Sequence, residues 1–276
     1  MIVQHNMTAL NANRQLGITN TNLARSTEKL SSGYRVNRAA DDAAGLSISE
    51  KMRGQIRGLE QASTNAEDGQ SLIQTAEGAL SEIHSVLQRM RELTVQASND
   101  TNVSADRKAI AKEVRALTSE INRIASQTQF NTMGLLSGGF KNKKLQVGAN
   151  TNQTISITIS SMTAGKLGVS AKVIAKVISS STGKDITKLI TTVNTAITKV
   201  STQRSALGAL QNRLDHTIAN ADNMAENLQS SESKIRDVDM ADEMVSYSAS
   251  SILQQAGQSM LAQANQATQG VLSLLQ

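Results

Sequence analysis

The sequence predicts a mainly α-helical protein, an elongated antiparallel helical rod or coiled-coil bundle with a small β-hairpin region and both termini helical and paired at the same end. Three observations support this. The 276 residues include no Pro, so nothing locks φ against a helix or removes a backbone donor. Aromatic residues make up only 1%, too few for an ordinary globular core. Aliphatic residues instead recur at seven-residue steps.

The N-terminal segment carries this heptad pattern as far as about Leu30. Its two rows are Val3, Leu10, Gly17, Ala24 and Ala9, Leu16, Leu23, Leu30. Gly33 suits the left-handed position that follows a helix. We expect Asp41 and Asp42 to cap the next helix, because carboxylates accept hydrogen bonds from the free N–H groups there. A catalytic acid pair is the less favoured alternative, since adjacent side chains diverge on a helix.

A helix of about 50 residues is predicted over 44–97. Its heptad rows are Met52, Leu59, Ala66, Ile73, Leu80, Leu87 and Ile48, Ala62, Gly69, Ala76, Ile83, Met90, Ala97. At about 1.5 Å per residue such a helix is roughly 75–80 Å long, which is typical of a coiled coil or an elongated bundle. Ser104 is the expected N-cap of a second helix that folds back antiparallel on the first.

Alternating apolar residues predict a β-hairpin farther along the chain. Leu145 and Val147 precede the turn-rich residues 148–152, and Ile155, Ile157 and Ile159 follow them. Segment 160–182 remains open between strand and helix. From 186 a heptad pattern predicts another helix of about 50 residues, with the rows Ile186, Val193, Val200, Leu207, Leu214, Ala221, Leu228, Ile235 and Leu189, Ala196, Leu210, Met224, Val238.

The last stretch, 244–276, contains no charged residue. One helical stripe runs along it: Leu253, Ala256, Met260, Ala264, Ala267, Val271, Leu274. Burying this stripe gains roughly 10–20 kcal/mol at best, at about 1.5–3 kcal/mol for each large side chain. Ordering the backbone costs more, at about 1–2 kcal/mol per residue. A folded tail must therefore bury itself against other copies or other segments.

These patterns divide the chain into three parts. Residues 1–42 and 235–276 are expected as terminal helices, residues 43–139 and 186–234 as a helical rod, and residues 140–185 as a short surface-exposed β-hairpin region attached to that rod. Five basic against three acidic residues in 1–43, and two basic against four acidic in 233–276, give the two ends opposite net charge. Opposite charge modestly favours contact between them.

Composition argues against several functions. The net charge of +5 comes mainly from 137–185, where seven Lys face one Asp without Arg, which is typical of a solvated surface and not of a nucleic-acid site. The three His are scattered and Cys is absent, so we expect no metal site. No phosphate-binding loop or nucleophile–base set is present, so we expect no cofactor and no enzymatic activity. No signal peptide or membrane-length apolar run is found.

Several segments together resemble one family. Residues 6–10 (Asn-Met-Thr-Ala-Leu), 28–49 (Glu-Lys-Leu-Ser-Ser-Gly-Tyr-Arg-Val-Asn-Arg-Ala-Ala-Asp-Asp and the residues that follow) and 127–131 resemble the amino-terminal region of bacterial flagellins. Residues 207–214 and 252–266 resemble the carboxyl-terminal region. The resemblance covers roughly 1–140 and 186–276, so the chain looks like a short, minimal flagellin without large outer domains.

This resemblance implies a structural subunit that self-assembles into the helical flagellar filament for motility. It implies export of the unfolded chain through the flagellar secretion channel to an extracellular location. The implied partners are further flagellin subunits, the cap and hook-junction proteins, and a cytoplasmic chaperone at the carboxyl tail; no nucleic acid or membrane insertion is expected. In the filament the terminal segments pair as the inner core. The expected polymerisation residues are Val3, Leu10, Leu16, Leu23, Leu30, Leu253, Met260, Ala264, Val271 and Leu274.

The resemblance also implies recognition by a flagellin-sensing Toll-like receptor. The matching residues are Gln88, Arg89, Leu93 and, on the facing helix, Glu113. We expect Leu93 to be an exposed apolar anchor rimmed by charge. Two alternatives to the filament subunit stay open: a hook–filament junction protein and, outside the family, an intracellular coiled-coil adaptor.

Overall fold

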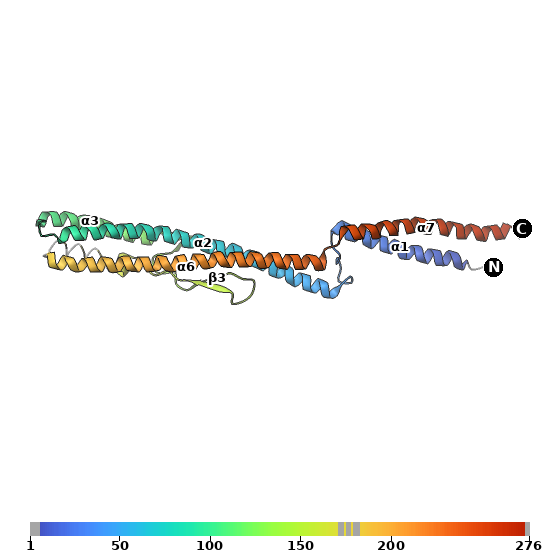
Figure 1. Cartoon of the computed structure of the whole chain (residues 1–276), viewed down its shortest axis with the longest axis horizontal. Helices are drawn as coiled ribbons and strands as arrows, with labels where there is room; N and C mark the ends of the chain where they lie inside the picture. Colours follow the sequence, from blue (N-terminus) through green and yellow to red (C-terminus); the bar gives the residue numbers. More distant parts are fainter. Residues whose placement is uncertain (1–5, 171–173, 175–177, 179–182, 274–276) are drawn as a thin grey trace. The chain divides into compact units, whose positions relative to one another are not determined.

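The computed structural model describes residues 6–170, 174, 178 and 183–273 and confirms a mainly α-helical fold with a small β region (Figure 1). The elements in chain order are α1 (Met7–Ser32), α2 (Ala43–Ser98), α3 (Ser104–Gln127), β1 (Gln129–Phe130), β2 (Met133–Gly134), β3 (Lys143–Gln146), β4 (Thr154–Ile157), α4 (Ala164–Leu167), α6 (Gly183–Arg236) and α7 (Met240–Ser273). The two long helices expected from the heptad rows are α2 and α6.

The chain forms two compact units. Unit 1 comprises Met1–Ile56 and Glu226–Gln276, and unit 2 comprises Arg57–Ala225. The division between the two units therefore lies within α2 and α6. Unit 1 takes the beginning of α2 and the end of α6 because both contact the connector that follows α1.

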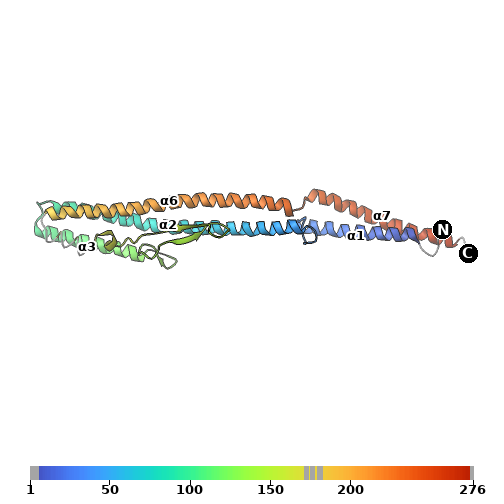
Figure 2. The same ribbon diagram turned by 90° about the horizontal axis from the view of Figure 1, so that it is seen from below.

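Unit 2 is built from α2, α3 and α6, which run side by side in this part of the chain, with α3 and α6 antiparallel to α2 (Figure 2). Polar pairs link α2 to α6: Gln70 donates to Asp215 at 2.9 Å and Arg204 approaches Glu77 at 3.5 Å. The heptad rows lie between the helices. Fully buried members include Ile73, Leu80, Leu87, Ile83, Met90, Val193, Val200, Leu207 and Leu214.

The start of α3 differs from the expectation. Ser104 is the first helical residue, and Val103 occupies the N-cap position. Val103 has no side-chain oxygen, so the capping interaction comes instead from Asp106, which accepts a hydrogen bond from the Val103 N–H at 3.2 Å. The sequence predicts Ser104 as the N-cap because its hydroxyl can accept a hydrogen bond, whereas in the structure the carboxylate of Asp106 at N3 makes the interaction.

The predicted hairpin is formed by antiparallel β3 and β4, with Leu145 opposite Ile155. Its tip at 150–154 is exposed, but its inner face belongs to the core, because Ile155, Ile157 and Ile159 are buried. Gly69 of α2 lets the hairpin approach closely, since a Cβ there would collide with the Leu145 side chain.

The segment after the hairpin also contributes to the core of unit 2. Met162 and Leu167 of the α4 region are buried, as are Ile174 and Ile178, while the residues around these two lie outside the described part of the chain. Region 140–185 is thus surface-exposed only in part. Among the described residues, no helix is both long and apolar enough to cross a membrane.

Ile157→Ala should lower the free energy of unfolding of unit 2 by about 2–5 kcal/mol, because it opens a cavity under the hairpin. Denaturant unfolding followed by circular dichroism measures this. Ser156→Ala is the matched control, since its side chain points to solvent from the same strand. Equal unfolding free energies for the two variants would contradict the assignment of this hairpin face to the core.

Candidate self-assembly surface

In unit 1 the two ends of the chain pair as antiparallel helices, α1 against α7, as Figure 1 shows. Three contacts along the pair fix the register. The Asn6 side chain donates to the Ala264 carbonyl at 3.0 Å, Gln254 donates to Asn20 at 2.8 Å, and Lys29 lies 3.5 Å from Glu243. The predicted pairing of the termini is confirmed.

The seam between α1 and α7 is made mainly of small and polar residues. The less exposed positions recur at heptad spacing and are Ala9, Ala12, Leu16, Thr19, Leu23, Ser26 and Leu30 of α1, with Glu243, Tyr247, Ser250, Gln254, Gly257, Leu261 and Ala264 of α7. The helices approach closely, since a Cβ at Gly257 would lie 3.3 Å from Leu16 Cδ1. Thr19 and Ser26 are buried in this seam.

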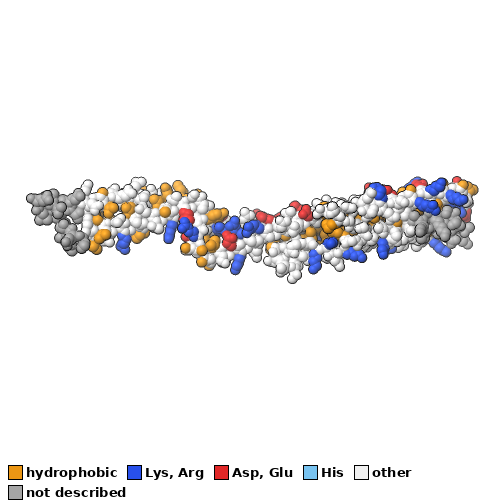
Figure 3. Space-filling model, turned by 180° about the vertical axis from the view of Figure 1, so that it is seen from behind, with side chains coloured by type: hydrophobic (Ala, Val, Ile, Leu, Met, Phe, Trp, Pro, Cys, Tyr) orange, Lys and Arg blue, Asp and Glu red, His pale blue; other side chains and the backbone are white. Residues whose placement is uncertain are grey.

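Large apolar side chains lie on the outer faces of the same two helices. On α1 these are Met7, Leu10 and Ile18, exposed by 60%, 58% and 46%. On α7 they are Val245, Ile252, Leu253 and Met260, exposed by 70%, 65%, 60% and 61%. Figure 3 shows hydrophobic side chains on the surface of these terminal helices. We call this set the outer apolar face.

The expected polymerisation residues therefore fall into two groups. Leu16, Leu23, Leu30 and Ala264 lie in the seam within one subunit, and Leu10, Leu253 and Met260 lie on the outer apolar face. Val3 and Leu274 lie outside the described residues, and Val271 lies in α7 beyond the last side chain described.

The junction after α1 centres on Arg236, the last residue of α6. Its guanidinium lies 2.9 Å from a Glu50 carboxylate oxygen and 4.7 Å from the centre of the Tyr34 ring. Its carbonyl accepts hydrogen bonds from the backbone N–H groups of Arg35 at 2.7 Å and Val36 at 3.4 Å. One residue thus ties the connector to both long helices. Sequence reasoning missed Arg236 because these contacts join positions about 200 apart, for which heptads carry no signal.

Two carboxylates organise the rest of the connector. Asp42 accepts from the Gly45 N–H at 2.8 Å and caps α2, as expected. Asp41 does not cap α2. It accepts from the N–H groups of Arg38 at 2.9 Å and Asn37 at 3.2 Å and closes the preceding turn. The hydrogen bond from Arg38, followed by that from Asn37, holds the pKa of Asp41 below its ordinary value, so this stabilisation is present near neutral pH and is lost as pH falls.

The expected receptor residues lie on α2 and α3 in unit 2. Arg89 is exposed and bridges Glu92 at 3.1 Å and Glu113 at 3.0 Å. The hydrogen bond with Glu92 has the largest effect on the pKa of Arg89, followed by that with Glu113, and both raise it. Gln88 is also exposed.

The expectation that Leu93 is an exposed anchor is wrong. Leu93 is only 2% exposed and packs in the core of unit 2. The signal was present in the sequence, because position 93 lies three residues after Met90 and four before Ala97, both members of a heptad row. The charged residues near Leu93 therefore do not surround an exposed apolar side chain.

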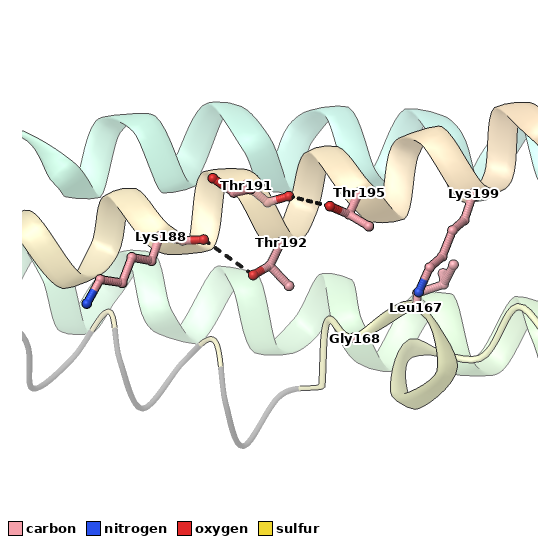
Figure 4. Close-up of a pocket in the computed structure, with 7 residues that line it drawn as sticks. All are labelled: Leu167, Gly168, Lys188, Thr191, Thr192, Thr195 and Lys199. Atoms are coloured by element: carbon pink, nitrogen blue, oxygen red, sulfur yellow. Dashed lines mark hydrogen bonds between the residues drawn. The ribbon is translucent and has the colours of Figure 1, made fainter.

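A pocket beside α4 and α6 is lined mainly by Thr and Lys side chains. Figure 4 shows its lining, which is Leu167, Gly168, Lys188, Thr191, Thr192, Thr195 and Lys199. The Thr192 and Thr195 hydroxyls donate to carbonyls of their own helix, at 3.3 and 2.9 Å. In the described part of the chain no group of three His, Asp or Glu side chains could hold a metal ion.

Arg236→Gln should loosen the junction by about 1–3 kcal/mol, because it removes a charge-assisted hydrogen bond and a cation–π contact. Hydrogen exchange at the amides of Arg35 and Val238, which bond to Arg236 and Gly33, measures the loss. Arg213→Gln on the exposed side of α6 is the control. Unchanged protection of both amides in Arg236→Gln would contradict the central position of this side chain.

Comparisons with known proteins agree with this architecture. Residues 3–141 match the bacterial flagellin N-terminal helical region, and residues 190–275 match the bacterial flagellin C-terminal helical region. A flagellin of Halalkalibacterium halodurans is 53% identical and one of Bacillus subtilis is 48% identical, each match covering all of both chains.

Solved structures add two likenesses. The crystal structure of Bacillus cereus flagellin has a TM-score of 0.50 and 30% identity, covering 60% of this chain and 94% of the other. A putative flagellar hook-associated protein from Vibrio parahaemolyticus has a TM-score of 0.61, covering 71% and 100%. At 12% identity, this second likeness concerns the fold alone.

Proposed function

This chain belongs to the bacterial flagellin family, and from that premise we propose that its subunits polymerise through the outer apolar face of α1 and α7. Flagellins are structural proteins, and their homologues form the flagellar filament, which is extracellular. The chain is accordingly a subunit of a helical filament. The outer apolar face is the surface proposed to join one subunit to the next.

One observation carries the proposal. Several large apolar side chains, among them Leu10, Ile252 and Leu253, point away from the α1–α7 seam, and the seam itself consists mainly of small and polar residues beside four Leu. Each large apolar side chain gains about 1.5–3 kcal/mol on full burial. Neighbouring subunits supply that burial, and the pairing of α1 with α7 does not. An exposed apolar surface of this kind is typical of a protein interaction site.

Export and the remaining partners follow from the same premise. We propose that the chain travels unfolded through the flagellar secretion channel, which its lack of Cys favours because no disulfide can form first. We propose that a cytoplasmic chaperone covers the apolar face of α7 before export. Cap and hook-junction proteins complete the proposed set of contacts at the two ends of the polymer.

The two alternatives predict different products. A hook–filament junction protein stops after a limited number of copies, and a coiled-coil adaptor closes as a small oligomer. Identity of 53% and 48% over full length with flagellins favours the filament subunit over both. Electron microscopy after seeding distinguishes open-ended filaments from closed oligomers.

We also propose that Gln88, Arg89 and Glu113 are contacted by a Toll-like receptor. Their support is their exposure on adjacent helices and the ion pair that holds Arg89 against Glu113. Leu93 has no part in this surface. Its replacement by Ala opens a core cavity at a cost of about 2–5 kcal/mol, so that variant reports on folding.

The double variant Ile252→Gln, Leu253→Gln should raise the critical concentration for polymerisation at least about tenfold, because polar side chains replace two apolar ones on the outer face. Sedimentation and electron microscopy after seeding measure this, with circular dichroism to monitor helicity. Ser248→Gln, an exposed polar position of the same helix, is the control. Polymerisation of the double variant at the control's critical concentration would refute the proposed surface.

Arg89→Glu should weaken receptor signalling about tenfold or more, since it reverses the charge of an exposed contact. The swap Arg89→Glu, Glu113→Arg restores an ion pair between the helices but not the arrangement of charges on the surface, so it should signal as weakly as the single variant. Arg115→Ala, exposed on α3, is the control in a receptor-reporter cell assay. Full signalling by the swapped variant would argue for a purely structural ion pair.

A further inference from the structure

Sulfur in this chain is present only as methionine, because there are ten Met and no Cys. The methionines differ sharply in exposure. Met7 of α1 and Met260 of α7 are 60% and 61% exposed, and Met244 is 49% exposed. Met90 and Met162 in the core of unit 2 are 0% and 4% exposed. The oxidisable sulfur on the terminal helices is thus available to solvent, and that in the core is shielded.

Met7 and Met260 also belong to the outer apolar face. Met260 follows Leu253 by one heptad, so the two side chains lie on the same side of α7, away from the α1-facing row. Met7 lies three residues before Leu10 and shares its side of α1. The exposed sulfur atoms therefore lie within the surface proposed to join subunits.

We propose that Met7 and Met260 are reversible oxidation sites through which hydroperoxides stop growth of the polymer. The proposal rests on the function proposed above, because it requires the outer apolar face to be buried between subunits. Met240 and Met244 of α7, each 49% exposed, are further oxidisable positions with a smaller effect on growth.

The reaction balances with a hydroperoxide as the only co-reactant. A lone pair of the thioether sulfur attacks the terminal peroxide oxygen and the O–O bond breaks. The sulfur is oxidised to the sulfoxide, and the remaining peroxide oxygen takes up a proton and leaves as an alcohol or, from hydrogen peroxide, as water. Methionine sulfoxide reductases reverse the change. A dithiol supplies the two electrons and two protons and becomes a disulfide, and the sulfoxide oxygen leaves as water.

Oxidation changes the surface at these positions without breaking the helices. The sulfoxide replaces a flexible apolar side chain with a polar one. Burying this oxygen between subunits without a hydrogen-bond donor weakens association, about tenfold for each sulfoxide. In an assembled polymer the same sulfur atoms are covered, so the free subunit is the sensitive form.

The first experiment treats purified full-length subunits with hydrogen peroxide and follows each methionine by peptide mass spectrometry. Met7 and Met260 should oxidise at least about tenfold faster than Met90 and Met162, which exposure dictates. In seeded filaments their oxidation should slow by a similar factor. Equal rates at Met260 in subunits and filaments would overturn the proposal.

The second experiment measures growth on untreated seeds. Peroxide-treated subunits should show a critical concentration raised about tenfold or more, and a sulfoxide reductase should restore it. The variant Met7→Leu, Met260→Leu should grow normally after the same treatment, since Leu fills a similar volume and resists oxidation. Growth of that variant as poor as treated wild type would overturn the proposal.

Polar substitutions distinguish a methionine on the outer apolar face from an exposed methionine elsewhere, without the use of an oxidant. Met260→Gln should impair growth, and Met224→Gln, at a 47% exposed methionine of α6, should not. Equal growth of both would overturn the proposal. Failure of untreated subunits to grow on any seed would instead count against the function proposed above, and the oxidation rates of the free subunit would still test the accessibility of Met7 and Met260.

Discussion

The pairing of α1 with α7 buries only part of the apolar surface of these two helices, and the organisation of unit 1 follows from that constraint. A seam made mainly of Ala, Ser, Thr, Gln and Gly, with a few Leu, brings the two backbones close together but leaves much apolar surface unburied. Side chains such as Ile252 and Leu10 are left on the outside. A two-helix structure with several large apolar residues in solvent is typical of a component of a larger structure, and family membership identifies that structure as a filament.

Unit 2 differs from unit 1, because its apolar residues form a filled core within the subunit. Three helices bury most positions of their heptad rows, and the hairpin closes over α2 where Gly69 leaves room for Leu145. Core burial there is continuous from Ala66 to Ala97 along α2. The contrast between a filled core in one unit and a polar seam in the other separates folding from assembly within a single chain.

Heptad spacing predicted the long helices and the buried rows of unit 2, and two-residue alternation predicted the β-hairpin, since these features depend on local periodicity. Heptad spacing did not predict which of two apolar rows of a terminal helix faces its partner. In α7 the inward row contains Gly257, Gln254 and Ser250, which hydrophobicity alone ranks last. Small residues in a row indicate that two helices approach closely along it. Hydrophobicity instead favours the row with Leu253 and Met260 as the one that faces the partner helix.

Other features were beyond any periodic pattern. The contacts of Arg236 with Tyr34 and Glu50 join distant segments, so only the folded chain reveals them. The position of Leu93 has a different explanation. The family resemblance implies an exposed receptor contact, whereas the spacing to Met90 and Ala97 indicates a buried core residue, as the structure shows. Periodicity was the better guide at that position.

The junction also determines where the chain can change length. Tyr34 bridges to Asp237, and the paired positions from there to the ends of α1 and α7 keep nearly the same register, as Lys29 with Glu243 and Asn20 with Gln254 show. One residue inserted between this bridge and either helix rotates that helix by about 100° and exchanges its seam for its outer face. The hairpin tip at 150–154 has no such phase relation to a partner helix, so an inserted residue there leaves the seam of α1 and α7 unchanged.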